Sequence, residues 1–265
     1  MVESIFRAEG ERFLPTEHAR GPWDPRALHG GAPAALMTAA FERMEPGADL
    51  AVARLGFELL RPVPLAPLSI STRIVRAGRR VQELAGELHA GEDLICRASA
   101  LRVQPVPDGL PEAKPGVGGA PAASMPGPEA GREVRFALDD STEASFAASA
   151  MEMRFLDDPL ALGPARVWMR LRHPLLPDEP ASSLARLAAT ADFGNGVSAA
   201  LPFADYLFIN ADLTIHLQRQ PRGEWIGLDA RTLLPSGGGG LAESVLHDVE
   251  GPLGRAFQTL VVQPR

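Results

Sequence analysis

Asp192 is the carboxylate whose surroundings in the sequence suggest acid–base chemistry. It lies in the alanine-rich segment TADFGNGVSAAL, which carries no other charged residue and belongs to a predicted helix over residues 182–201. A charge in such a place is unfavourable unless it has partners, and a carboxylate near the end of an apolar helix can take a proton from water. The structural alternative is that Asp192 caps a break in the helix near Gly194 and Gly196.

His29, Gly30 and Gly31 stand at the start of another predicted helix, residues 28–44. Apolar residues recur there at three- and four-residue spacing, and Pro33 is tolerated because it lies in the first turn. The glycine pair leaves backbone N–H groups uncovered at the positive end of the helix dipole, which suits an anion or a polarised carbonyl oxygen. The alternative is that the glycines only make room for close packing.

Composition narrows the classes of function. The chain has 265 residues, of which 45% are hydrophobic, and a formal net charge of −7. It is long enough for two ordinary domains, and its charge argues against nucleic acid as a partner, since a basic stripe would be expected. The single cysteine, Cys96, excludes an intrachain disulfide and a multi-cysteine metal site. His173, His216 and His247 are scattered, and His216 and His247 lie on predicted strands without acidic or cysteine ligands at metal spacing, so we expect no metal and no cofactor.

No apolar run approaches the about 20 residues that cross a bilayer. The first ten residues are mixed and charged, unlike a secretory signal. We therefore expect a soluble, cytoplasmic protein that does not insert into a membrane.

Most of the chain outside the two helices has the alternating pattern of strands. In the first half we predict strands, with a turn at 89–93, over 4–15, 52–63, 68–78 and 79–103. In the second half we predict strands over 133–140, 150–157, 164–173, 206–219, 224–234, 241–249 and 253–263. Residues 104–131 are dense in proline, glycine and alanine, have no period and are predicted to be a linker.

The two halves can be superimposed with a constant spacing of 158 residues. The spacing pairs Arg61 with Arg219, Arg73 with Arg231, His89 with His247 and Arg97 with Arg255. Because the spacing is constant through four predicted strands, it indicates two copies of one helix-plus-sheet unit.

A helix wrapped by an antiparallel sheet, present twice, resembles the tandem hotdog proteins of the acyl-CoA thioesterase II family. The resemblance rests on HGGAPAALM, FELLRPVPL and GRRVQELAGELHAGEDLICRASALRV in the first half, and on TADFGNGVSAAL, NADLTIHLQRQPRGEW and EGPLGRAFQTLVVQ in the second. It implies an α+β double hotdog with its two sheets joined edge to edge. We expect an N-terminal hotdog over 1–104, a linker over 105–131 and a C-terminal hotdog over 132–265.

The resemblance also implies a set of catalytic residues. The family's catalytic aspartate lies in the second-half helix, where Asp192 matches it, and a glutamine in the last strand matches Gln258. The family has a hydroxyl residue at the start of the strand after the helix, where this chain has Asn210, with Thr214 as a substitute hydroxyl nearby. The implied mechanism is attack on a thioester by a water molecule that Asp192, Asn210 and Gln258 hold.

The implied substrate is a fatty or related acyl-CoA, which would be hydrolysed to free acid and CoA. His29, Gly30 and Gly31 would form part of the acyl-CoA binding site, and homodimers could form through the sheets. Two alternatives remain open. The spacing of Asp24 and His29 resembles the acid–base pair of hotdog enoyl-CoA hydratases. The second alternative is a non-catalytic acyl-CoA-binding hotdog protein, because this chain has Asn210 where the family has a hydroxyl residue.

Overall fold

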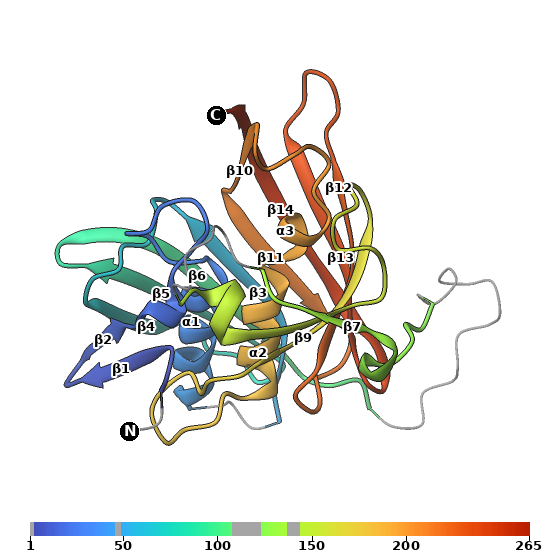
Figure 1. Ribbon diagram of the computed structural model, residues 1–265. Coiled ribbons are helices and arrows are strands. Elements are labelled where there is room, and N and C mark those ends of the chain that lie inside the picture. The colour runs from blue at the N-terminus through green and yellow to red at the C-terminus, as the bar shows by residue number, and fades with distance from the viewer. Residues whose placement is uncertain (1–2, 46–48, 108–122, 137–143) are drawn as a thin grey trace.

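The computed structural model describes residues 3–45, 49–107, 123–136 and 144–265. Figure 1 shows two units side by side, the N-terminal one in blue to green and the C-terminal one in yellow to red, with the main helices at the centre. The elements of the N-terminal unit are β1 (Phe6–Glu9), β2 (Arg12–Pro15), η1 (Glu17–Ala19), α1 (Gly31–Arg43), β3 (Ala51–Leu59), β4 (Leu68–Arg76), β5 (Val81–Ala90) and β6 (Asp93–Val103).

The C-terminal unit follows the same plan with additional short elements. In order these are η2 (Pro128–Ala130), β7 (Arg132–Val134), η3 (Phe146–Ala150), β8 (Met151–Phe155), β9 (Ala165–Leu171), α2 (Ser183–Ala191), α3 (Gly194–Val197), β10 (Tyr206–Asn210), β11 (Asp212–Leu217), β12 (Ile226–Leu233), β13 (Gly240–Asp248) and β14 (Gly251–Pro264). The predicted turn at 89–93 is confirmed, because β5 ends at Ala90 and β6 begins at Asp93.

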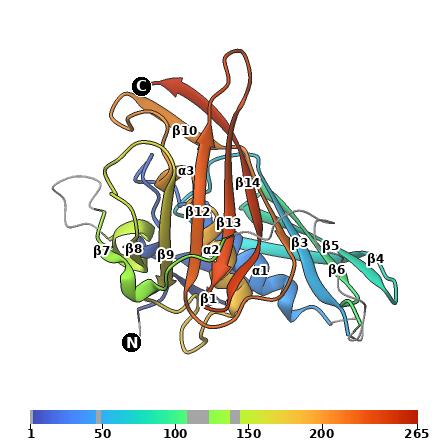
Figure 2. The ribbon, with the colours of Figure 1, turned by 90° about the vertical axis from the view of Figure 1, so that its right-hand side faces the viewer.

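Within the described residues, the strands form one antiparallel sheet, and the strand order of the C-terminal unit mirrors that of the N-terminal unit about the middle. The order is β1-β2-β4-β5-β6-β3-β11-β14-β13-β12-β9-β8-β7, and β10 pairs with β14 beside this path. β3 pairs with β11 at the middle, so the two units continue one another edge to edge (Figure 2). Gly56 of β3 lies opposite Thr214 of β11, and these two residues are themselves 158 apart. A pseudo-twofold axis therefore passes between Gly56 and Thr214.

The two main helices pack against each other because both carry small side chains at the contact. Gly31 of α1 lies so close to the carbonyl oxygen of Ala189 in α2 that an added Cβ would collide with it. On the sheet side of α1, Met37 and Phe41 fill the space above Gly86 of β5, where a Cβ would lie 2.7 Å from Met37. The glycines thus set how closely α1 approaches both α2 and the sheet.

Two predicted elements prove to be broken. The single helix predicted over 182–201 was wrong, since α2 ends at Ala191, Asp192 is its C-cap and α3 is a separate short turn. The single strand predicted over 206–219 was also wrong, since it divides at Ala211 into β10 and β11. Both breaks bear on the site, because each changes the direction of the chain beside a polar side chain.

Part of the predicted linker lies outside the described residues, namely 108–122 within 105–131. Its last part forms η2, and β7 begins directly afterwards at Arg132. We therefore propose the boundaries 1–104 and 132–265 for the two units. Among the helices of the described residues, none has the length and apolar character that crossing a bilayer requires.

Candidate active site

Asp192 occupies the end of α2, buried beside the first turn of α1. Ser182 starts α2 as its N-cap, its hydroxyl oxygen accepting from the N–H of Ala185, and Asp192 ends it as the C-cap. Only 5% of Asp192 is exposed. A carboxylate this deeply buried needs hydrogen-bond donors, and two side chains of the C-terminal unit supply them.

Two amide side chains bind the same carboxylate oxygen. Asn210 donates through Nδ2 to Asp192 Oδ1 at 2.8 Å. Gln258 donates through Nε2 to the main-chain oxygen of Asp192 at 2.9 Å and approaches Oδ1 at 3.3 Å. Asn210 is the last residue of β10 and Gln258 lies in β14. The structure therefore brings together three residues that are far apart in the chain.

The amide of Gln258 has its orientation fixed from the other side. Its Oε1 accepts from the main-chain N–H of Asn195 at 2.9 Å, which leaves Nε2 facing Asp192. Gly194 permits this contact, because a Cβ there would lie 2.8 Å from Gln258 Oε1 and from Ser244 Oγ. The break after α2 thus presents a backbone donor to Gln258.

The N-terminal unit contributes His29 and Gly30. His29 Nδ1 lies 3.1 Å from Asp192 Oδ2, and Phe193 and Phe146 stack against the imidazole with centroid distances of 4.2 and 5.1 Å. A Cβ on Gly30, the N-cap of α1, would lie 2.7 Å from Asp192 Oδ2. The positive end of the α1 dipole consequently faces the carboxylate.

The Nδ1 atom of His29 has two competing neighbours. It lies 3.0 Å from the N–H of Gly31 and 3.1 Å from Asp192 Oδ2. An unprotonated Nδ1 accepts from Gly31, whereas a protonated Nδ1 donates to Asp192, and one nitrogen cannot do both. The position of this proton therefore couples the imidazole to the carboxylate.

Two buried acceptors on residues of this site have no hydrogen-bond partner among the described residues. They are Oδ1 of Asn195, whose main-chain N–H binds Gln258, and Oδ1 of Asn210, whose Nδ2 binds Asp192. A buried amide oxygen normally has a donor, so these atoms suit a water molecule or a polar group of a bound ligand.

Models of known protein families match both units of this chain. The model of the acyl-CoA thioesterase N-terminal domain matches residues 19–103, and the model of the acyl-CoA thioesterase C-terminal domain matches residues 120–262. The chain belongs to the acyl-CoA thioesterase family. A comparison with curated proteins by sequence found no match.

Solved structures share the fold of this thioesterase-family chain at low sequence identity. A protein of unknown function with a hot dog fold from Alicyclobacillus acidocaldarius is 17% identical, with a TM-score of 0.70 over 98% of this chain and 95% of its own. The acyl-CoA thioesterase II TesB2 from Mycobacterium marinum is 17% identical, with a TM-score of 0.60 over 100% and 94%. The CurK dehydratase is 12% identical, with a TM-score of 0.53 over 91% and 85%. The predicted double hotdog is confirmed.

Two residues suggested for the site lie elsewhere. Asp24 is bonded to Arg26 at 2.9 Å on the surface, a contact that lowers the pKa of Asp24, so the acid beside His29 is Asp192 and not Asp24. Thr214 lies in a groove of about 610 Å³, because the break at Ala211 shifts the alternation of the strand. It therefore does not substitute for Asn210.

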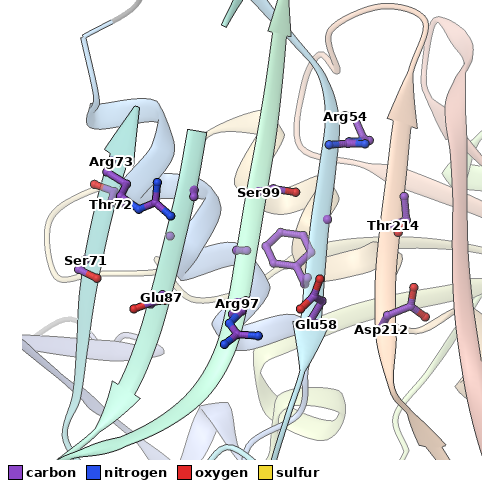
Figure 3. Close-up of a pocket in the computed structure, with 15 residues that line it drawn as sticks. Arg54, Glu58, Ser71, Thr72, Arg73, Glu87, Arg97, Ser99, Asp212 and Thr214 are labelled. Atoms are coloured by element: carbon purple, nitrogen blue, oxygen red, sulfur yellow. The ribbon is translucent and has the colours of Figure 1, made fainter. Parts of the chain in front are cut away.

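Figure 3 shows this groove, whose labelled polar side chains come from β4, β5, β6, β3 and β11. Arginines and acidic residues both line it, with Glu58 and Asp212 directly opposite each other, and its lining includes none of His29, Asp192, Asn210 and Gln258. The groove is thus separate from the cluster of His29, Asp192, Asn210 and Gln258, the Asp192 cluster.

Several features of the cluster in this thioesterase-family chain differ from the expectations drawn from the sequence. The amides of His29 and Gly31 are not uncovered, since the N–H of His29 donates to the oxygen of Ala19 and that of Gly31 to His29 Nδ1. The N–H of Asn195 as the partner of Gln258 was not predicted. Gly194, directly before Asn195, was the available signal, since a glycine can mark backbone packed closely against other groups.

Proposed function

We propose that this chain hydrolyses a fatty or related acyl-CoA to free acid and CoA, with Asp192 as the general base. The observation that carries the proposal is a buried carboxylate whose Oδ1 is bound by Asn210 and approached by Gln258, while its Oδ2 faces His29. Family membership makes a thioester the expected substrate.

The reaction needs one water molecule and no covalent enzyme intermediate. Water attacks the thioester carbonyl carbon and gives a proton to Asp192, and negative charge develops on the carbonyl oxygen. The intermediate then collapses, the carbon–sulfur bond breaks and the CoA thiolate takes up the proton. Asn210 Oδ1 can accept a hydrogen bond from the attacking water, while Gln258 keeps the carboxylate in place.

His29, Gly30 and Gly31 form the side of the cluster that belongs to the N-terminal unit. We propose that an acyl-CoA thioester lies against them, with its carbonyl oxygen toward the positive end of α1. His29 can relay to the leaving thiolate the same proton that Asp192 takes from water, since His29 Nδ1 lies 3.1 Å from Asp192 Oδ2.

A thiol-release assay over saturated acyl-CoA esters of increasing chain length tests this function. Cys96 does not disturb a thiol reagent, because burial, with a smaller contribution from Glu58, raises the pKa of its thiol to about 12. We expect catalytic release of CoA by the wild-type chain and by Asp24→Asn, a control at the exposed carboxylate. Tight binding of every ester with no release would instead indicate a non-catalytic binding protein.

Water addition to the double bond of an enoyl-CoA is a second candidate. The 3.1 Å contact between His29 and Asp192 favours it, because an imidazole and a carboxylate together can add and remove protons. Loss of enoyl absorbance without thiol release would support this activity and overturn the hydrolase proposal.

A further inference from the structure

A second polar cluster lies outside the Asp192 site and joins three separate segments. Glu3 precedes β1, His18 lies in η1, and His173 follows β9. One ligand atom from each of these residues lies within 4.8 Å of the other two. His18 Nε2 is 3.3 Å from Glu3 Oε2, and the two imidazoles stack with centroids 4.1 Å apart.

Ser149 determines which nitrogen of a neutral His18 carries the proton. The hydroxyl of Ser149 donates to the main-chain oxygen of Ser145 at 2.7 Å, so its one hydrogen is already used. Its Oγ also lies 2.8 Å from His18 Nδ1 and must therefore accept from it. Nε2 of neutral His18 is left with a lone pair directed at the carboxylate of Glu3.

A lone pair and a carboxylate oxygen 3.3 Å apart repel unless a cation lies between them. Two atoms that bind one tetrahedral zinc ion at about 2.1 Å each are separated by about 3.4 Å, close to the distance observed here. The Ser149 contact is also of the kind that orients metal-binding histidines, whose other ring N–H is usually held by an oxygen acceptor.

His173 is suited to be the third ligand. Its ligand nitrogen lies within 4.8 Å of the ligand atoms of both Glu3 and His18, and its side chain is partly buried.

We propose that Glu3, His18 and His173 bind one divalent transition-metal ion of the zinc class. Two imidazole nitrogens and one carboxylate oxygen form a donor set typical of zinc, with a fourth position left for water. From the sequence we expected no metal. The proposed site was not apparent there, because His18 and His173 are far apart in the chain. The Glu3 side chain is 72% exposed, so its carboxylate has room to adjust toward an ion shared with the two histidines.

The ion would hold the N-terminal segment against the C-terminal unit. The N–H groups of Ile5 and Phe6 already donate to the oxygens of Pro174 and Leu175 at 3.0 and 2.9 Å. A metal ligated by Glu3 and His173 strengthens this attachment, and binding to the folded state alone raises the melting temperature.

Titration calorimetry with Zn²⁺ on untagged, EDTA-treated and dialysed protein tests the proposal, with Co²⁺ absorption reporting the ligand geometry. We expect one Zn²⁺ per chain and a higher melting temperature on binding. His18→Gln and the exposed-site variant Glu3→Gln should each weaken binding at least about tenfold, and Ser149→Ala about 10- to 100-fold. His216→Gln, a control at an exposed histidine of β11, should bind as the wild type does.

Two results would overturn the proposal. One is the absence of Zn²⁺ and Co²⁺ binding by the wild type, which would mean that a protonated His18 simply pairs with Glu3. The other is equal binding by wild type, Glu3→Gln and His216→Gln, which would indicate adventitious surface binding. Glu3→Gln keeps the test valid if His18→Gln does not fold, because Glu3 is exposed.

Discussion

At the scale of single residues, the Asp192 cluster depends on two amide side chains whose NH₂ groups face Asp192. Gln258 accepts from Asn195 and donates to Asp192, so its orientation follows from its partners. Asn210 donates to Asp192 Oδ1, as a hydroxyl at that position could also do. Asparagine in place of the family's hydroxyl residue therefore keeps the contact with the carboxylate.

Replacing Gln258 by alanine should affect both stability and turnover. The change leaves the buried N–H of Asn195 without an acceptor, which costs about 1–3 kcal/mol in the free energy of unfolding. It also releases the carboxylate, and a misplacement of about 1 Å can lower turnover about 10²-fold. Urea unfolding and thiol release measure the two effects separately. Unchanged turnover in a folded Gln258→Ala variant would remove Gln258 from the proposed site.

At the scale of elements, the approach of α1 to α2 positions the carboxylate against the N-terminal unit. Gly30 and Gly31 allow this approach, and the helix break after Asp192 provides the amide that orients Gln258. Asp192 is the C-cap of α2, as one interpretation of the sequence predicted, and it is also bound by polar side chains. Its catalytic role stays a prediction.

Gly30→Ala and Gly196→Ala form a matched pair that tests the helix approach. A Cβ at Gly30 would lie 2.7 Å from Asp192 Oδ2, so we expect turnover to fall at least about tenfold as the carboxylate is displaced. A Cβ at Gly196 in α3 meets nothing within 4 Å, so that variant should keep its turnover and gain up to about 1 kcal/mol of stability. Equal turnover in the two variants would show that the contact at Gly30 does not matter for the reaction.

The turn between β13 and β14 should make stability depend on acid pH. Burial would raise the pKa of Asp248, but hydrogen bonds from Arg219 and from the N–H groups of Arg222 and Glu250 outweigh it and lower the pKa. The folded value therefore lies below the unfolded value of about 3.9. The ionised carboxylate stabilises the fold above that pH, and the contribution is lost as the pH falls through the folded value.

The variant Asp248→Asn isolates the contribution of the ionised Asp248 carboxylate to the stability of the fold. We expect the variant to unfold about 2–4 kcal/mol more easily at neutral pH, less than a fully buried pair because Arg219 is 32% exposed. The difference from the wild type should shrink as the pH falls below about 4. Urea unfolding at several pH values checks this, and a difference that stays constant with pH would contradict the role given to Asp248.

At the scale of the whole molecule, the duplication was readable from the sequence and the assembly of the cluster was not. The spacing of 158 residues matches the starts of β4 and β12, Leu68 and Ile226, and those of β6 and β14, Asp93 and Gly251. Strand alternation and repeated residues are local or periodic signals, so a single sequence reveals them.

Other features depend on contacts between distant segments. The pairing of β3 with β11, the contact of His29 with Asp192 and the meeting of His18 with His173 have no local signature in the chain. The break at Ala211 also escaped prediction, because the alternation on either side of it reads as one strand. That break separates Asn210, which reaches the carboxylate, from Thr214, which lies in the groove.

Thiol release by Asp192→Asn tests the central claim most directly. Asparagine is nearly the same size and keeps hydrogen-bonding capacity at this buried position, but it cannot accept the proton of an attacking water. With circular dichroism and melting temperature close to the wild type, we predict a fall of about 10²–10⁴-fold in turnover of the best acyl-CoA substrate. Turnover within a few-fold of the wild type in the folded variant would contradict the role of Asp192 as the general base.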